Sequence, residues 1–334
     1  MGKYIVRRLL LLIPVLFGVS LATFVVMHSF TTDPATIILG EHATADRVAA
    51  LREELGLNKP IYVQFADYLS GALKGDLGKS VITKTSITAE LMKRFPATVE
   101  LAVSAVIIAS ILGILLGVVS AVRQNSLWDY GSMGVALLGV SMPIFWLGLM
   151  MIILFSVTLG WLPASGRITI GMAPEDITGM YLVDALITGN TAAFEDAFRH
   201  LIMPALALGS YSTAIIARMT RATMLETIRQ DYIRTARAKG LRENVVIFKH
   251  ALRNALIPIV TVIGLQMGAL LGGAVLTETV FSWPGIGSYV VEGILVSDYP
   301  RVQGAVLLIG TVFVLVNLLV DVVYSLIDPR IQHS

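Results

Sequence analysis

Six long apolar stretches run through the 334-residue sequence and limit what it can fold into. The hydrocarbon core of a bilayer takes about 20 helical residues to cross, and lipid offers no partner to an unpaired backbone N–H or C=O. Each stretch should therefore be a membrane-spanning helix, so we predict an all-α polytopic membrane protein with six transmembrane helices. The predicted spans are residues 9–30, 99–122, 132–159, 201–219, 256–280 and 304–327.

The composition agrees with this fold class and disfavours several kinds of site. Hydrophobic residues make up 55% of the chain and charged residues 14%, whereas a soluble globule has about 45–50% and 25%. There is no cysteine, and the five histidines show no metal-ligand spacing, so we predict no disulfide and no metal site. The first apolar run is longer than the roughly 7–15 residues of a secretory signal core, and we expect it to remain as the first span.

The distribution of charged residues predicts the orientation in the membrane. If the N-terminus is cytoplasmic, the inside segments (1–8, 123–131, 218–255 and 328–334) carry 14 basic and 5 acidic residues. The outside segments (31–98, 160–200 and 281–303) then carry 11 basic and 15 acidic residues. Because basic residues accumulate in cytoplasmic loops, we expect both termini, including the tail at 328–334, to be cytoplasmic.

The first outer loop, residues 31–95, carries a helical pattern of its own. Apolar residues recur at helical spacing over residues 45–55 and again after Pro60. We therefore predict a helical extracytoplasmic subdomain between an N-terminal span (1–30) and a transmembrane core (96–327). Two interpretations stay open. The subdomain is either a cap over the span ends or a docking platform for an extracytoplasmic partner. The second is considered because a patterned loop of this length is more often functional than filler.

No ATPase site is predicted in the chain. Gly78-Lys79-Ser80 resembles the end of a phosphate-binding loop, but Leu73 stands where that motif needs its first glycine. The segment is also predicted to face outward, away from cytoplasmic ATP. We therefore expect that the chain is not an enzyme and binds no cofactor of its own.

Four residues of the predicted fifth span are candidates for helix packing or for a substrate route. Gly264, Gly268 and Gly272 recur every fourth residue, and small residues at this spacing let another helix approach closely. We expect this stripe to serve helix packing, within the chain or between subunits. Glu278 lies near the outer end of the span, and because charge is costly there it is a candidate for lining a substrate route.

A basic polar stretch, residues 218–258, separates the fourth and fifth spans. It holds nine of the 25 Lys and Arg residues against three acidic residues. Residues 231–240 favour a short helix that ends at Gly240, where left-handed backbone is tolerated. An acidic partner protein or anionic lipid would suit this charge. We expect no nucleic acid, because aromatic stacking residues and any recognisable binding module are lacking.

Several motifs, in order along the chain, resemble one family. Residues 235–241 (TARAKGL) and 250–258 (HALRNALIP) are similar to the EAA loop of bacterial ABC importer permeases, in the version of the dipeptide, oligopeptide and nickel group. Residues 7–14 (RRLLLLIP), 51–57 (LREELGL) and 277–287 (TETVFSWPGIG) resemble other parts of that group's first permease. The resemblance covers nearly the whole chain and implies a type I ABC importer permease fold in the bacterial cytoplasmic (inner) membrane.

The resemblance also implies partners and a role for the basic stretch. A type I importer joins two homologous permease subunits to two cytoplasmic ATPase subunits, which use ATP and Mg, and to an extracytoplasmic substrate-binding protein. The EAA loop contains the coupling helix, whose small residues, here Ala236 and Gly240, are expected to let it fit an ATPase groove. Carried over to this chain, docking falls to Arg234, Thr235, Ala236, Arg237, Gly240, Leu241 and Arg242.

This chain departs from the general EAA pattern at two positions. Arg234 stands where the motif has an acidic residue, and Arg253 where it usually has proline. The docking role can be carried over, but a salt bridge from the acidic residue to the ATPase cannot.

The leading functional prediction is import of di- or oligopeptides. The alternative within the family is nickel or a metal chelate, against which the lack of cysteine weighs slightly. A secondary transporter is less consistent with the sequence, because it would need inverted repeats and ionisable residues near the membrane midplane. An intramembrane enzyme would need a nucleophile and base, or metal ligands, inside the spans, and no such constellation is visible.

Overall fold

The computed structural model describes residues 2–30, 33–40, 43–54 and 56–327, and most of these residues are helical. The long helices are α1 (Gly2–Phe30), α5 (Ile87–Val122), α9 (Thr191–Ile228), α12 (Arg253–Gly273) and α15 (Tyr299–Ile327). The shorter elements are α2 (Pro34–Leu39), α3 (Ala45–Glu54), α4 (Ile61–Leu73), α6 (Leu127–Ser141), α7 (Ile144–Met151), the π-helix η1 (Ile152–Thr158), α8 (Tyr181–Ile187), α10 (Asp231–Ala238), α11 (Glu243–Val245), the π-helix η2 (Val246–Leu252), α13 (Val275–Val280) and α14 (Ile286–Leu295).

Five of the described helical segments are long and apolar enough to cross a membrane, and a bent pair makes a sixth if it is counted as one span. The bent pair is the predicted third span, which is not one straight helix: α6 meets α7 and η1 at a bend of 107°. The cause is Pro143, which lacks an N–H and forces Met142 before it into extended backbone, with φ −103° and ψ 137°.

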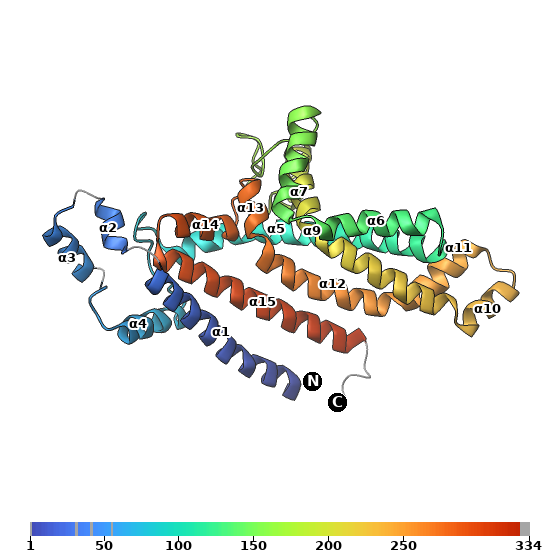
Figure 1. The fold of residues 1–334 in the computed structure, drawn as a ribbon, viewed down its shortest axis with the longest axis horizontal. Helices are drawn as coiled ribbons and strands as arrows, with labels where there is room; N and C mark the ends of the chain where they lie inside the picture. The colour runs from blue at the N-terminus through green and yellow to red at the C-terminus, as the bar shows by residue number, and fades with distance from the viewer. Residues whose placement is uncertain (1, 31–32, 41–42, 55, 328–334) are drawn as a thin grey trace.

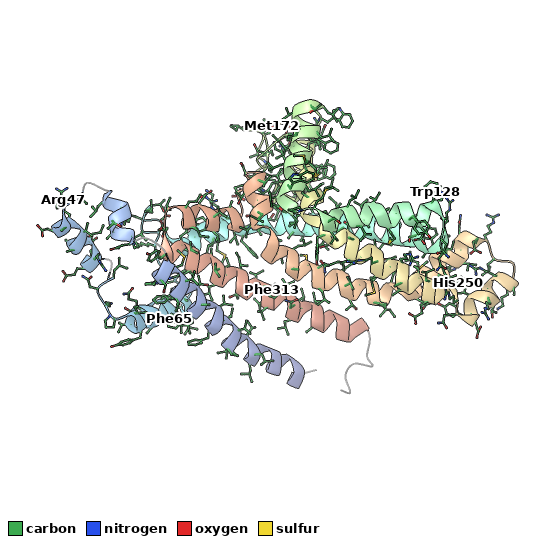
Figure 2. The ribbon with its side chains drawn as sticks, in the orientation of Figure 1. Arg47, Phe65, Trp128, Met172, His250 and Phe313 are labelled. Atoms are coloured by element: carbon green, nitrogen blue, oxygen red, sulfur yellow. The ribbon has the colours of Figure 1, made fainter. Side chains whose placement is uncertain are left out.

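The long helices form an elongated bundle with different elements at its two ends (Figure 1). α5 and α9 pack along each other, α12 lies between α9 and α15, and α1 packs on α15. α2, α3 and α4 lie at one end, while α10 and α11 lie at the other. Arg47 and Phe65 mark the first end in Figure 2, and Trp128 and His250 the second. α7 projects sideways from the bundle.

Glycines allow the closest helix contacts. A Cβ on Gly113 of α5 would lie 2.8 Å from the Cβ of Ile216 of α9, and a Cβ on Gly209 of α9 would lie 2.8 Å from the carbonyl oxygen of Ala105. No Cβ is tolerated at such distances without a backbone shift. The α5–α9 pair can therefore keep this separation only with glycine at these positions.

The predicted glycine stripe of α12 packs against α15 of the same chain. A Cβ on Gly264 would lie 2.6 Å from Cγ1 of Val320, and one on Gly268 would lie 2.9 Å from Oδ1 of Asn317. Gly272 is less crowded, with Phe313 at 3.9 Å. In this structure the stripe therefore serves packing inside the chain.

The segment predicted to be the outer subdomain contains the two helices that the apolar patterns predict, α3 and α4. Leu55 and the tail at 328–334 lie outside the described residues. α4 is held to α1 by the ring of Phe65, whose centroid lies 5.7 Å from that of Phe17 and 5.2 Å from that of Phe24. α2 was not predicted, although Asp33 caps it by accepting from the Ala35 N–H at 3.0 Å and Pro34 suits its first turn.

Replacing Gly264 with leucine should destabilise the protein. The added side chain would meet Val320 at the α12–α15 contact, and overpacking of this kind costs about 1–3 kcal/mol. The measurement is the thermal unfolding midpoint of the purified protein in detergent. Gly131→Ala in α6 is the matched control, because a Cβ there meets nothing within 4 Å; equal losses in both variants would contradict the packing role of Gly264.

Candidate functional site

The helix predicted from the basic stretch is α10, at the end of the bundle opposite the outer subdomain (Figure 1). Asp231 in its first turn and Arg237 in its last turn both favour the helix dipole. The chain turns after α10 at Gly240, whose φ of +75° is the left-handed backbone expected there. A Cβ at Gly240 would meet nothing within 4 Å. Glycine is therefore favoured here by the backbone conformation of the turn, and not by a lack of space for a side chain.

One face of α10 is buried against its own chain. Ile233 is 0% exposed and Ala236 is 6% exposed. Both belong to a hydrophobic cluster with Met224 of α9 and Val246 and Ile247 of η2. The expectation that Ala236 presents its small side chain to a partner is therefore not met in this structure, because that side chain packs α10 onto η2.

The other residues assigned to docking lie on the exposed face. Arg234, Thr235, Arg237, Gly240, Leu241 and Arg242 are all exposed. The guanidinium of Arg237 bonds Glu243 at 2.6 Å and that of Arg234 bonds Asp231 at 3.3 Å. Leu241 is an exposed apolar residue among these charges. The surface is thus available to a partner, and ATPase docking itself stays a prediction.

A hydrogen bond that the sequence did not indicate ties α10 to α12. The side-chain amide of Asn254 donates to the hydroxyl of Tyr232 at 3.0 Å and to the carbonyl oxygen of His250 at 2.9 Å. Asn254 belongs to the motif at 250–258, which therefore helps to position α10.

Farther from α10, where α13 packs on α7, the motif at 277–287 folds around Glu278. This carboxylate is 0% exposed and accepts from the hydroxyl of Thr98 at 2.7 Å and the backbone N–H of Ser288 at 3.0 Å. A Cβ on Gly285 would collide with the carboxylate. The indole N–H of Trp283 donates to the carbonyl oxygen of Ala97 at 2.9 Å. Glu278 thus fastens this loop to α5, and its role in a substrate route stays a prediction.

A buried ion pair fastens the loop before α8 to the same part of α5. Arg167 binds Glu100 at 2.6 Å, with side-chain exposures of 7% and 5%. Arg167 also donates to the carbonyl oxygen of Gly179 at 2.7 Å and stacks on the ring of Tyr181. Glu100 accepts from the Leu182 N–H at 2.7 Å. The sequence analysis missed Arg167, although it is one of only two basic residues in the otherwise acidic segment 160–200.

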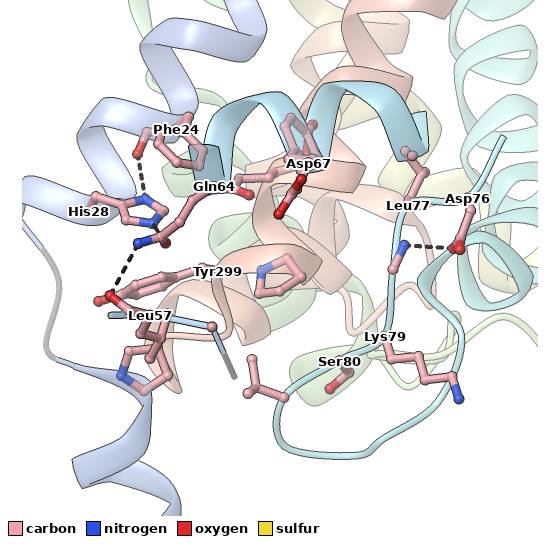
Figure 3. Close-up of a pocket in the computed structure, with 18 of the residues that line it drawn as sticks. Phe24, His28, Leu57, Gln64, Asp67, Asp76, Leu77, Lys79, Ser80 and Tyr299 are labelled. Atoms are coloured by element: carbon pink, nitrogen blue, oxygen red, sulfur yellow. Dashed lines mark hydrogen bonds between the residues drawn. The ribbon is translucent and has the colours of Figure 1, made fainter. Parts of the chain in front are cut away.

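A cavity of about 530 Å³ opens between α1, α4, the segment 76–84 and the start of α15 (Figure 3). His28 lies on one side of it, with Nδ1 at 2.9 Å from the carbonyl oxygen of Phe24 and Nε2 at 3.2 Å from Oε1 of Gln64. Lys79 and Lys84 also line the cavity, and neither has an ion-pair partner among the described residues. Asp67 and Asp76 line it as well, but Asp67 pairs with Lys59 and Asp76 accepts from the Gly78 N–H. An acidic group from outside the chain would suit the two unpaired lysines.

Tyr68 connects the wall of this cavity to α15. Its hydroxyl donates to the carbonyl oxygen of Gln303 at 3.1 Å. Burial raises the pKa of Tyr68 to about 12. The phenol therefore stays protonated and keeps this hydrogen bond even at an alkaline pH of about 10, where an ordinary tyrosine titrates.

Replacing Glu278 with alanine should lower stability by about 1–3 kcal/mol, because the Thr98 hydroxyl and the Ser288 N–H would be left buried without an acceptor. The unfolding midpoint measures this loss, and Glu195→Ala, at an exposed site on α9, is the control. The role of Glu278 in a substrate route is tested separately, by measuring the uptake of several substrates by the assembled transporter that carries Glu278→Ala. Unchanged uptake by a folded Glu278→Ala protein would leave the residue with a structural role alone.

Comparison with known proteins relates this geometry to a family. The family described as "Binding-protein-dependent transport system inner membrane component" matches residues 113–333, and its N-terminal counterpart matches residues 1–102. The chain is 52% identical over 333 residues to the dipeptide transport system permease protein DppB of Alkalihalophilus pseudofirmus, with all of both chains covered. It is 50% identical over 335 residues to the di/tripeptide transport system permease protein DppB of Pseudomonas aeruginosa, again with complete coverage.

The chain is also similar to a relative that is named for a different substrate. The glutathione transport system permease protein GsiC of Escherichia coli is 41% identical over 334 residues, with all of both chains covered. Together with the helical, membrane-spanning fold, these similarities give the family. The chain belongs to the binding-protein-dependent transport system inner membrane components, and it is a multi-pass membrane permease of that family.

Proposed function

We propose that the chain is the permease subunit of an ATP-driven importer that moves di- or oligopeptides delivered by an extracytoplasmic binding protein. The observation that carries this proposal is similarity over the whole chain to relatives named for dipeptide transport, at 52% and 50% identity. Nickel or a metal chelate remains the alternative cargo, and a secondary transporter is the less favoured class.

The proposed complex contains a second homologous permease and two cytoplasmic ABC ATPase subunits. ATP and Mg belong to the ATPases, and this chain supplies neither a catalytic residue nor a bound cofactor. Both termini and the α10 end are cytoplasmic in this proposal. The excess of basic residues in the segments predicted to lie inside supports the orientation.

The attachment of α10 suits it to transmit movement from the ATPases. Only Arg229 and Gln230 separate it from α9, and its buried face packs against η2, which continues into α12. Because protein interiors are close-packed and transmit strain, a displacement of α10 would move α9 and α12 with it. Closure of the ATPases would then favour one arrangement of the permease by binding it more tightly.

The class and the cargo can be tested in one experiment. The complex would be purified through a tag on this chain, and its ATPase activity would be measured with the binding protein and with peptides of increasing length or nickel. We expect two ATPase subunits to co-purify and peptides to stimulate hydrolysis. Stimulation by nickel alone would transfer the proposal to the alternative cargo, and the absence of any ATPase would reject it.

Leu241→Asp should uncouple the ATPases without unfolding the chain. Leu241 is 41% exposed, so a carboxylate there costs little in the isolated chain but would be desolvated in a docked groove. We expect at least about a tenfold loss of ATPase co-purification, which corresponds to about 1.4 kcal/mol. Asn244→Asp, on exposed α11 three residues away, is the matched control. Ala236→Asp is a poor test, because it would bury charge inside this chain.

We propose the cavity of Figure 3 as the place where the binding protein docks through an acidic side chain. Lys79→Glu together with Lys84→Glu should raise the binding-protein concentration needed for half-maximal ATPase stimulation by about tenfold at low salt, and less at high salt. The control is Lys74→Glu, which reverses a nearby exposed charge outside the cavity. An equal effect of Lys74→Glu would show that the binding protein is attracted to the charge of the whole surface and not to the cavity.

A further inference from the structure

A second cavity, of about 410 Å³, lies between α6 and α9 near the α10 end of the bundle. The turn before α6 and α6 itself as far as Leu137 form one wall, and α9 forms the other. Its polar side holds Asp129, Tyr130, Arg218 and Arg221, and its apolar side holds Met133 and Leu137. The polar and the apolar residues that line the cavity therefore lie at different positions along α6.

The polar side has an unused positive charge. Arg221 is committed to Asp129, with Nε and Nη2 at 2.9 and 2.8 Å from its two carboxylate oxygens. Asp129 is 2% exposed and also accepts from the Ser120 hydroxyl and, at 3.0 Å, from the Asn125 N–H. Arg218 is exposed and has no ion-pair partner among the residues that the structure describes. Its guanidinium is therefore free to bind an anion.

The apolar side begins one helical turn farther along α6. Met133 and Leu137 follow Asp129 at intervals of four residues, so they continue the same face, and Leu137 is 45% exposed. Trp128 and Tyr130, at the polar end, are 60% and 67% exposed. Aromatic side chains of this kind gather at the level of lipid headgroups. From Arg218 to Leu137 the surface thus changes from basic to apolar, as a bilayer leaflet does from headgroup to acyl chain.

We propose that this cavity binds one anionic phospholipid, with the phosphodiester at Arg218 and an acyl chain along Met133 and Leu137. Guanidinium groups suit phosphate because they donate two parallel hydrogen bonds, and basic pockets between membrane helices hold anionic headgroups. A soluble anion would leave the apolar side uncovered. The lipid would brace α6 against α9 near the α10 end of the bundle, and this binding does not depend on which substrate the transporter carries.

The test is native mass spectrometry of the delipidated full chain with phosphatidylglycerol or phosphatidylcholine of the same acyl chains. We expect tighter binding of phosphatidylglycerol to the wild type. Arg218→Gln should weaken it by about fivefold, the value of one interfacial arginine, and Arg218→Lys should keep most of it. Arg229→Gln, at an exposed arginine of the same stretch that lies outside the cavity, should change nothing.

Four results would overturn the proposal. Equal affinity for the two lipids would show that headgroup charge has no role. An equal loss of affinity in Arg229→Gln would show that any arginine of this stretch attracts the lipid. Displacement of phosphatidylglycerol by glycerol phosphate at the same concentration would reduce the cavity to a site for a free anion. Repeating the measurement on the whole transporter should give the same Arg218 dependence; its disappearance there would mean that another subunit occupies the cavity. Because lipid binding is read without uptake, failure here leaves the proposed transport function untouched.

Discussion

The close contact between α5 and α9 is the constraint on which the rest of the structure depends. Lipid tails provide no hydrophobic force between membrane helices, so association relies on close packing. Gly113, Gly117 and Gly209 make that packing possible here. α6 and α12 then pack on α9, and α10 follows directly after it. With 38 residues, α9 is about 57 Å long, enough to connect the loop that ends at Asn190 to the α10 end.

One short segment of α5 holds two loops, the one after α13 and the one before α8. The Ala97 carbonyl oxygen accepts from Trp283, and Thr98 donates to Glu278 while accepting from the Ile286 N–H at 2.9 Å. Two residues later, Glu100 binds Arg167 and the Leu182 N–H. Burying such carboxylates is costly unless donors surround them, and both have several. The loops after α13 and before α8 are therefore positioned by the same helix that packs on α9, so a shift of α5 would move them together.

Local features of this fold could be predicted from the sequence, whereas distant pairings could not. The apolar spacing of residues 45–55 predicts α3, and Gly240 predicts the left-handed turn after α10, because both follow from neighbouring residues. Pro143 already carried the signal for the bend that the span prediction missed. The Arg167–Glu100 pair joins residues 67 positions apart, and nothing in a single sequence connects them. The Arg218 cavity could not be predicted either, because it depends on how α6 and α9 lie together.

Ala236 shows that a motif does not by itself reveal which neighbour a small residue meets. A small residue in a short helix allows close approach on either face, and the sequence does not say whether the neighbour is a partner or the chain itself. In the structure the neighbour is the cluster around Val246. The exposed pairs of Arg234 and Arg237 contribute only about 0–1 kcal/mol each, so α10 is held by its buried residues and by the Tyr232–Asn254 hydrogen bond. Its charged face and Leu241 are exposed and take no part in that buried packing. Rigid attachment on one face and freedom on the other are what an element needs if it is to pass a partner's movement into the membrane helices.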